Sequence, residues 1–278
     1  MYKTILVYVD ETAATAHRIE VAANLARKFE SHLVGTAITG LSAYMFPVSG
    51  IGAGMPPIVF PIDELRAAAA QVLDRFDQLA SSAGLSSFER SMVDDEAGFG
   101  ISLRARYSDV VVIGQCRSDA FTPGIRSDLA EHVVLNGMRP VLVVPHSSSV
   151  VDIGRIVTIG WNGSAEAVRA ITSAIPLLKR AQRVDLVVFN AEEDIELHGD
   201  DPGADMGLYL ARHGIRVKVS ATAAGRDDGD AILTFAADTG ADLIVMGAYG
   251  HSRFQEFLLG GMTRTALASS PVALWMSH

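Results

Sequence analysis

The chain has 278 residues and a formal net charge of −9, from 23 Lys and Arg against 32 Asp and Glu. This balance excludes a general binder of nucleic acid or anionic membranes, which needs a basic footprint. It leaves open a small anionic ligand held by backbone amides. Hydrophobic residues make up 49 % of the chain, which suits strands buried on both faces of a sheet.

The N-terminal sequence is strand-like and has neither the basic region nor the long apolar segment of a signal peptide. No apolar run is long enough to cross a bilayer. With its single cysteine, Cys116, the chain cannot form an intramolecular disulfide, which fits a reducing compartment. We therefore expect a cytoplasmic protein.

Strands and helices alternate in the first half of the chain. Apolar runs predict strands, and apolar residues at helical spacing predict helices between them. Strands are expected at 4–9, 32–38, 87–93, 109–113 and 141–145, and helices at 13–29, 63–82, 98–106 and 128–136. Residues 40–62 are rich in Gly and Pro and are expected to form an irregular insertion.

The second half repeats this order. Strands are expected at 155–162, 183–190, 216–222, 242–247 and 271–276, with helices at 165–181, 205–215, 230–240 and after 261. Alternation of this kind favours a parallel sheet covered on both faces. The sequence thus predicts two tandem doubly wound, Rossmann-like α/β domains, 1–148 and 149–278, each with a five-stranded, mainly parallel sheet.

A glycine-punctuated segment follows the fourth strand of the second half. Residues 247–263 read GAYGHSRFQEFLLGGMT and begin where a doubly wound sheet binds ligands, beyond the carboxyl ends of its strands. A glycine pair at a helix start lets backbone N–H groups approach an anion, and the helix dipole favours negative charge there. The segment therefore suggests a phosphate cradle, formed by Gly247, Gly250, Gly260, Gly261 and Thr263.

The spacing Gly-x2-Gly-x9-Gly, between a fourth strand and a helix, resembles the nucleotide motif of universal stress proteins. The resemblance covers the whole chain as two tandem domains. The family pattern has Ser or Thr directly after its third glycine, where this chain has Gly261, so one phosphate-facing hydroxyl is missing.

The resemblance implies a stress-response protein that binds an adenine nucleotide, ATP with or without Mg²⁺, in its C-terminal domain. It implies that the base lies near Asn162, and that backbone groups around Phe189 and Asn190 contribute. The phosphates would meet Gly250, Gly260, Gly261 and Thr263. Arg253, in the glycine loop, is a candidate for a contact with the phosphates or with the other domain.

The first half departs from the motif at two positions. Ser127 and Asp128 stand about where Gly260 and Gly261 stand, and Arg117 takes the place of Gly250. A carboxylate at the phosphate position would repel an anion, and we expect Ser127 to cap its helix instead. The first half is therefore expected to bind no nucleotide and to pack against its twin as an intrachain pseudo-dimer. Pairing of two chains into a homodimer stays open.

The sequence shows no Ser–His–Asp set, zinc spacing or P-loop, so no catalytic residue and no metal site is predicted. Two alternatives to a nucleotide-binding module remain. One is a slow ATPase acting at the same site. The other is a nucleotide-free scaffold, or a carrier of an apolar small ligand closed in by the 40–62 insertion.

Overall fold

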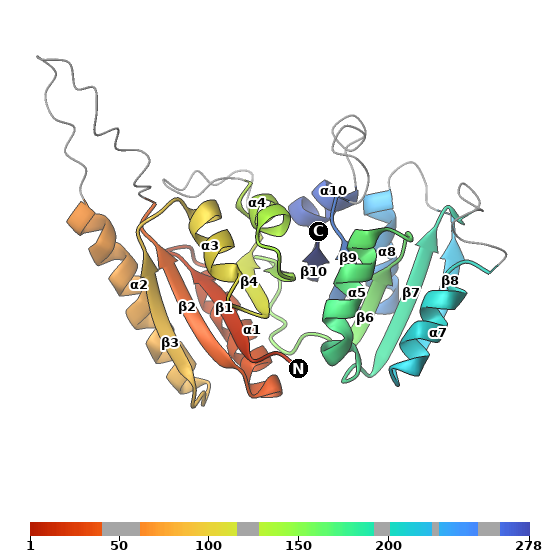
Figure 1. Cartoon of the computed structure of the whole chain (residues 1–278), viewed down its shortest axis with the longest axis horizontal. Coiled ribbons are helices and arrows are strands. Elements are labelled where there is room, and N and C mark those ends of the chain that lie inside the picture. The colour runs from red at the N-terminus through yellow and green to blue at the C-terminus, as the bar shows by residue number, and fades with distance from the viewer. Residues whose placement is uncertain (41–61, 116–127, 192–200, 224–227, 250–261) are drawn as a thin grey trace, which may run out of the picture.

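The computed structural model describes residues 1–40, 62–115, 128–191, 201–223, 228–249 and 262–278. Its strands form one ten-stranded sheet, and helices cover both faces (Figure 1). The first half contributes β1 (Thr4–Val9), β2 (His32–Ile38), β3 (Phe88–Val93), β4 (Val110–Gly114) and β5 (Val141–Val144). Its helices are α1 (Thr15–Phe29), α2 (Ile62–Ser82), α3 (Ala97–Ala105) and α4 (Leu129–Asn136).

The second half follows the same order of elements. Its strands are β6 (Ile156–Gly160), β7 (Arg183–Phe189), β8 (Val217–Thr222), β9 (Leu243–Gly247) and β10 (Ala273–Ser277). Its helices are α5 (Ala165–Leu178), α7 (Ala204–Arg212), α8 (Asp228–Thr239) and α10 (Met262–Ser269). The elements predicted from the sequence are present, with ends that shift by a few residues. No described helix is long and apolar enough to span a membrane.

The sheet joins the two halves in the order β3-β2-β1-β4-β5-β10-β9-β6-β7-β8. Every neighbouring pair within a half is parallel, whereas β5 and β10 pair antiparallel, with Trp275 opposite Leu142. The predicted α/β class and mainly parallel strands are confirmed. The sequence did not indicate that the two sets of five strands would form one continuous sheet.

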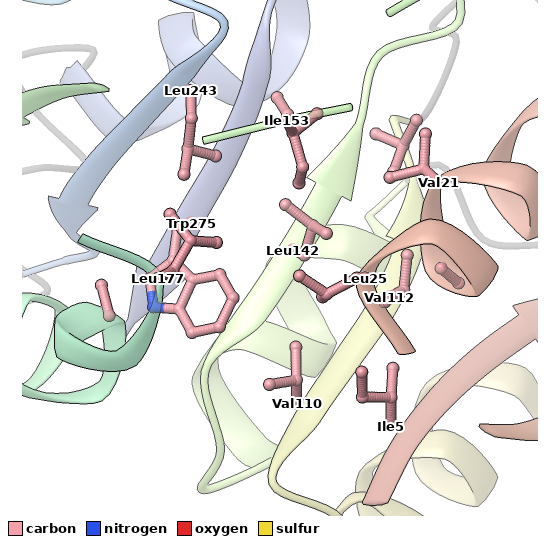
Figure 2. Packing of buried hydrophobic residues seen from close by; sticks show 14 of the residues in the cluster. Ile5, Val21, Leu25, Val110, Val112, Leu142, Ile153, Leu177, Leu243 and Trp275 are labelled. Atoms are coloured by element: carbon pink, nitrogen blue, oxygen red, sulfur yellow. The ribbon is translucent and has the colours of Figure 1, made fainter. Parts of the chain in front are cut away.

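Two hydrophobic clusters lie on opposite faces of this sheet, and each includes residues from both halves. Residues alternate between the faces along a strand, so Leu142 and Trp275 join one cluster and Val143 and Leu274 the other. Figure 2 shows Leu142, Trp275 and Leu177 converging in the first of these clusters. Trp275 is fully buried and its indole N–H donates to Ser173 Oγ at 3.0 Å, which satisfies its polar atom.

In each half, a carboxylate accepts hydrogen bonds from backbone N–H groups at the start of the first strand. Asp109 accepts from the backbone N–H groups of Lys3 and Thr4, at 2.6 and 3.0 Å. In the second half, Asp242 accepts from the N–H groups of residues 154–156. Asp109 directly precedes β4, which pairs with β1, and Asp242 directly precedes β9, which pairs with β6. Each carboxylate therefore stabilises the edge of the sheet opposite the predicted site.

Candidate functional site

The described residues of the predicted site lie at one edge of the second-half sheet. β6 pairs in parallel with β9 on one side and with β7 on the other. The ends of these three strands lead to Gly247, Asn162 and Asn190, and parallel strands end at the same edge of a sheet. The fold therefore places these three positions at one edge of the sheet.

Gly247 ends β9 against the first turn of α5. A Cβ atom at this position would lie 2.5 Å from Ala167 N and 2.7 Å from the carbonyl carbon of Glu166. Both are backbone atoms, which cannot move aside as a side chain can. Only glycine allows the end of this strand and the start of this helix to approach so closely.

Asn162 forms part of the cap of α5. Its Oδ1 accepts from Ser164 N at 3.2 Å and from Ser164 Oγ at 2.7 Å. Ser164 Oγ in turn accepts from Ala167 N at 3.1 Å, which satisfies one of the free N–H groups of the helix start. The Asn162 side chain is exposed, and its Nδ2 has no partner among the described residues. The amide therefore presents a hydrogen-bond donor at the end of β6.

Asn190 follows β7 in the left-handed backbone region, with φ 49°, which asparagine tolerates better than most residues. Its backbone N–H donates to Thr222 O at 3.1 Å and so extends the pairing with β8. Because this N–H group is engaged within the sheet, the predicted backbone contribution at Asn190 rests on its carbonyl group.

Thr263 lies in the first turn of α10 and is 3 % exposed. Its Oγ1 accepts from Tyr249 N at 3.2 Å, and Tyr249 has φ 58°. The hydroxyl thus connects the start of the glycine segment with the helix that follows it, and its hydrogen has no acceptor among the described residues. Gly250, Arg253, Gly260 and Gly261 lie outside the described residues, so their predicted roles stay predictions.

The first half carries a buried ion pair at the equivalent strand ends. Arg18 reaches from α1 to within 2.9 Å of Asp10 Oδ2, and their side chains are 3 % and 8 % exposed. Thr12 and Thr15 both donate to Asp10 Oδ1, and Arg18 Nε donates to Tyr8 O at 2.7 Å. The buried charges are therefore both paired and hydrogen-bonded.

The guanidinium group of Arg18 also lies against the end of β4. A Cβ atom at Gly114 would collide with Arg18 Nη1. In the second half, the register that matches Asp10 with Asn162 and Thr12 with Ser164 matches Arg18 with Ala170, which is buried. The space beside the glycine that ends the fourth strand thus holds the Arg18 guanidinium group in the first half, whereas in the second half the described neighbours of Gly247 are backbone and side-chain atoms of Glu166 and Ala167.

One expectation about the first half needs revision. α4 begins with Asp128 rather than Ser127 at the N-cap, and the Asp128 side chain makes no capping hydrogen bond. Sequence reasoning also missed Arg18, although a basic residue on the buried side of α1 was a usable signal. The insertion at 41–61 and residues 116, 117 and 192–200 lie outside the described residues. Across the described parts, no group of three or more His, Cys, Asp or Glu residues could hold a metal ion.

The Asp10–Arg18 pair predicts an acid-sensitive contribution to stability. Burial would raise the pKa of Asp10, but the charge of Arg18 and the hydrogen bonds from Thr12 and Thr15 outweigh it and hold the pKa below its ordinary value of 3.8. A carboxyl whose pKa is lowered by folding stabilises the fold above its unfolded pKa and loses this effect as the pH falls. Urea unfolding of wild type and Asp10→Asn should therefore differ at neutral pH and converge below about pH 4. A constant difference down to about pH 2 would contradict the assignment.

Residues 155–278 match the universal stress protein family. The whole chain is similar in structure to a universal stress protein from Archaeoglobus fulgidus, with a TM-score of 0.74 and 18 % identity over 99 % of this chain and 97 % of that one. A putative universal stress protein from Pseudomonas aeruginosa gives a TM-score of 0.62 at 12 % identity, over 99 % and 93 % of the two chains. A universal stress protein solved in complex with cAMP covers 52 % of this chain and 98 % of its own, with 17 % identity and a TM-score of 0.39. No curated protein sequence matches the chain.

Proposed function

Because residues 155–278 match the universal stress protein family, we propose that this half of the chain binds an adenine nucleotide, ATP in the first place, at the ends of β6 and β9. The observation that carries the proposal is the bare backbone at Gly247, which lies in contact with the first turn of α5. Gly247 itself carries no side chain where β9 ends and the glycine segment begins. Helix starts and glycine amides of this kind suit phosphate groups.

Each predicted site residue has a role in this proposal. The Nδ2 donor of Asn162 serves an acceptor atom of the base, and the carbonyl of Asn190 serves a donor. The amides of Gly250, Gly260 and Gly261 hold the phosphates, with the Thr263 hydroxyl and Arg253 as further donors. The phosphates bring Mg²⁺ when the nucleotide carries it, since this ion is commonly held by substrate phosphates.

The first half has a different role, and we expect one nucleotide per chain. Arg18 and Asp10 occupy the place beside Gly114 with a paired, buried network. The first half, residues 1–148, then acts as a pseudo-dimer partner for residues 149–278, and the pairing of β5 with β10 supports this role. The whole chain is proposed to work as a stress-responsive binding module.

Calorimetric titration of the full chain with ATP and Mg²⁺ tests the proposal. We expect a stoichiometry of one, and at least about a tenfold loss of affinity for Gly260→Asp or Gly261→Asp, because a carboxylate there repels phosphate. Asp128→Asn, at the equivalent position of the first half, should leave the affinity unchanged. Absence of binding by the wild type would refute the proposal, and a stoichiometry of two would refute the assignment of the first half.

The same samples separate a binding module from an enzyme. Phosphate release that persists through purification, and is lost on Thr263→Ala, would establish a slow ATPase at this site. Mass spectrometry of the natively purified chain would reveal a bound apolar molecule if the chain is instead a carrier. A binding module should release no phosphate, and its mass spectrum should show either the bound nucleotide or no ligand.

A further inference from the structure

α3 exposes an apolar stripe on its outer side. Phe99 and Leu103 are 49 % and 40 % exposed and lie four residues apart, so they share one side of the helix. Tyr107 follows one turn later and is 78 % exposed. Its backbone N–H donates to Arg104 O at 3.1 Å, so the chain is still turning when it reaches this residue. Phe99 and Leu103 therefore share one side of α3, and Tyr107 follows just beyond its C-terminal end.

The equivalent helix of the second half has no such stripe. α3 packs against α4 as α8 packs against α10, and Figure 1 shows α3 and α4 side by side. α3 and α8 can be aligned by matching Ile101 with Ile232 and Ala105 with Ala236, all four of which are buried. The positions of Phe99, Leu103 and Tyr107 then fall on Asp230, Thr234 and Asp238, all of them exposed. The fold itself therefore does not require apolar side chains on this surface.

Arginines surround the C-terminal end of the stripe. Arg104 and Arg106 belong to the end of α3, and Arg139 Nη2 donates to Arg106 O at 3.0 Å. None of the three has an ion-pair partner among the described residues. Met138, next to Arg139, is 77 % exposed and adds a further apolar side chain beside these arginines. The three arginines thus give this end of the stripe a basic border, although the net charge of the chain is −9.

The size of the surface indicates what kind of partner it suits. At their observed exposures, the four apolar side chains offer roughly 500 Å², given about 150–250 Å² for a whole aromatic side chain. A stable interface between globular proteins buries about 800 Å² on each partner. A single helix suits the smaller area that these side chains offer. Apolar side chains at positions i, i+4 and i+7 of that helix would match the stripe.

We propose that the α3 surface, formed by Phe99, Leu103, Tyr107 and Met138 with their bordering arginines, docks an acidic amphipathic helix of another protein. The apolar side of that helix packs along the stripe, and its carboxylates meet Arg104, Arg106 and Arg139. The charges of these arginines favour encounter with an acidic partner. This surface belongs to the first half of the chain, whereas the proposed nucleotide site belongs to the second.

Fluorescence anisotropy with synthetic peptides of roughly 16 residues, about four helical turns, tests this docking on the full chain. One peptide is amphipathic with Leu on one side and Glu on the other. A second replaces every Glu by Lys, and a third has the composition of the first in scrambled order. The wild type should bind the first peptide at least about tenfold more tightly than either of the others.

The triple variant Phe99→Asp, Leu103→Thr, Tyr107→Asp carries the residues of α8 at the same positions, so the fold should tolerate it. It should lose binding of the acidic peptide by at least about tenfold. Leu208→Asp, an exposed leucine on α7, should keep it. Equal binding by the triple variant, or preference for the Lys or scrambled peptide, would overturn the proposal. Sedimentation that shows a wild-type dimer and a monomeric triple variant would also overturn it, because the occupant would then be a second copy of the chain.

Discussion

Replacing Asp10 with alanine is expected to lower the free energy of unfolding by about 3–5 kcal/mol, because it leaves the Arg18 guanidinium buried without its counter-ion. The side chains of the pair are 8 % and 3 % exposed, so solvent screens them little. Thr12 and Thr15 also lose the acceptor to which they donate. Urea unfolding at neutral pH measures the change.

Two matched variants show whether the loss comes from the pair. The double variant Asp10→Ala, Arg18→Ala should be less destabilised than the sum of the two single variants, because no charge is left unpaired. Asn162→Ala, at the same position of the second half, removes an exposed side chain that supports a helix cap and should cost about 1 kcal/mol. If Asp10→Ala and Asn162→Ala cost the same, the ion pair contributes nothing specific.

Replacing Gly247 with alanine is expected to reduce nucleotide affinity by at least about tenfold and to destabilise the chain by about 1–3 kcal/mol. The added Cβ would lie 2.5 Å from Ala167 N, the same N–H group that Ser164 caps. The end of β9 and the start of α5 must then move apart, which displaces both sides of the proposed site. Calorimetry measures the affinity, and urea unfolding measures the stability.

Gly114→Ala is the matched control, because Gly114 ends the fourth strand of the first half. Its new Cβ would meet the far end of the Arg18 side chain rather than backbone atoms. It should leave nucleotide affinity unchanged, whatever it does to stability. Equal losses of affinity in the two variants would mean that the effect is global, and an unchanged affinity in Gly247→Ala would remove Gly247 from the site.

The strands and helices were predictable because their signals are local. A run such as the one at 110–113 is apolar throughout, as a strand buried on both faces requires, and α1 has apolar residues at helical spacing. The positions of Gly247 and Asn162 at neighbouring strand ends followed from the order of parallel strands. These features depend on residues that are close in sequence or on a general rule of the fold.

What could not be predicted depends on contacts between distant residues. The pairing of Leu142 with Trp275 depends on two strands that are far apart along the chain, and neither strand indicates its partner. The sequence predicts an asymmetry in nucleotide binding from Asp128 and Arg117, and the structure adds a further difference between the halves in Arg18, which lies beside Gly114. Its effect depends on how far an arginine side chain reaches from α1 to the end of β4, which spacing alone does not give.

The antiparallel pairing of β5 and β10 has a consequence for how the chain can be divided. A cut between the halves would leave an unpaired strand edge on each fragment, and these edges are apolar, with Val141–Val144 and Trp275 fully or almost fully buried in the intact chain. Bare edges of this kind attract strands of other molecules and promote aggregation. Each half thus protects the other from misassociation, and a shortened form of this protein would need charged or proline substitutions along the exposed strand to stay monomeric.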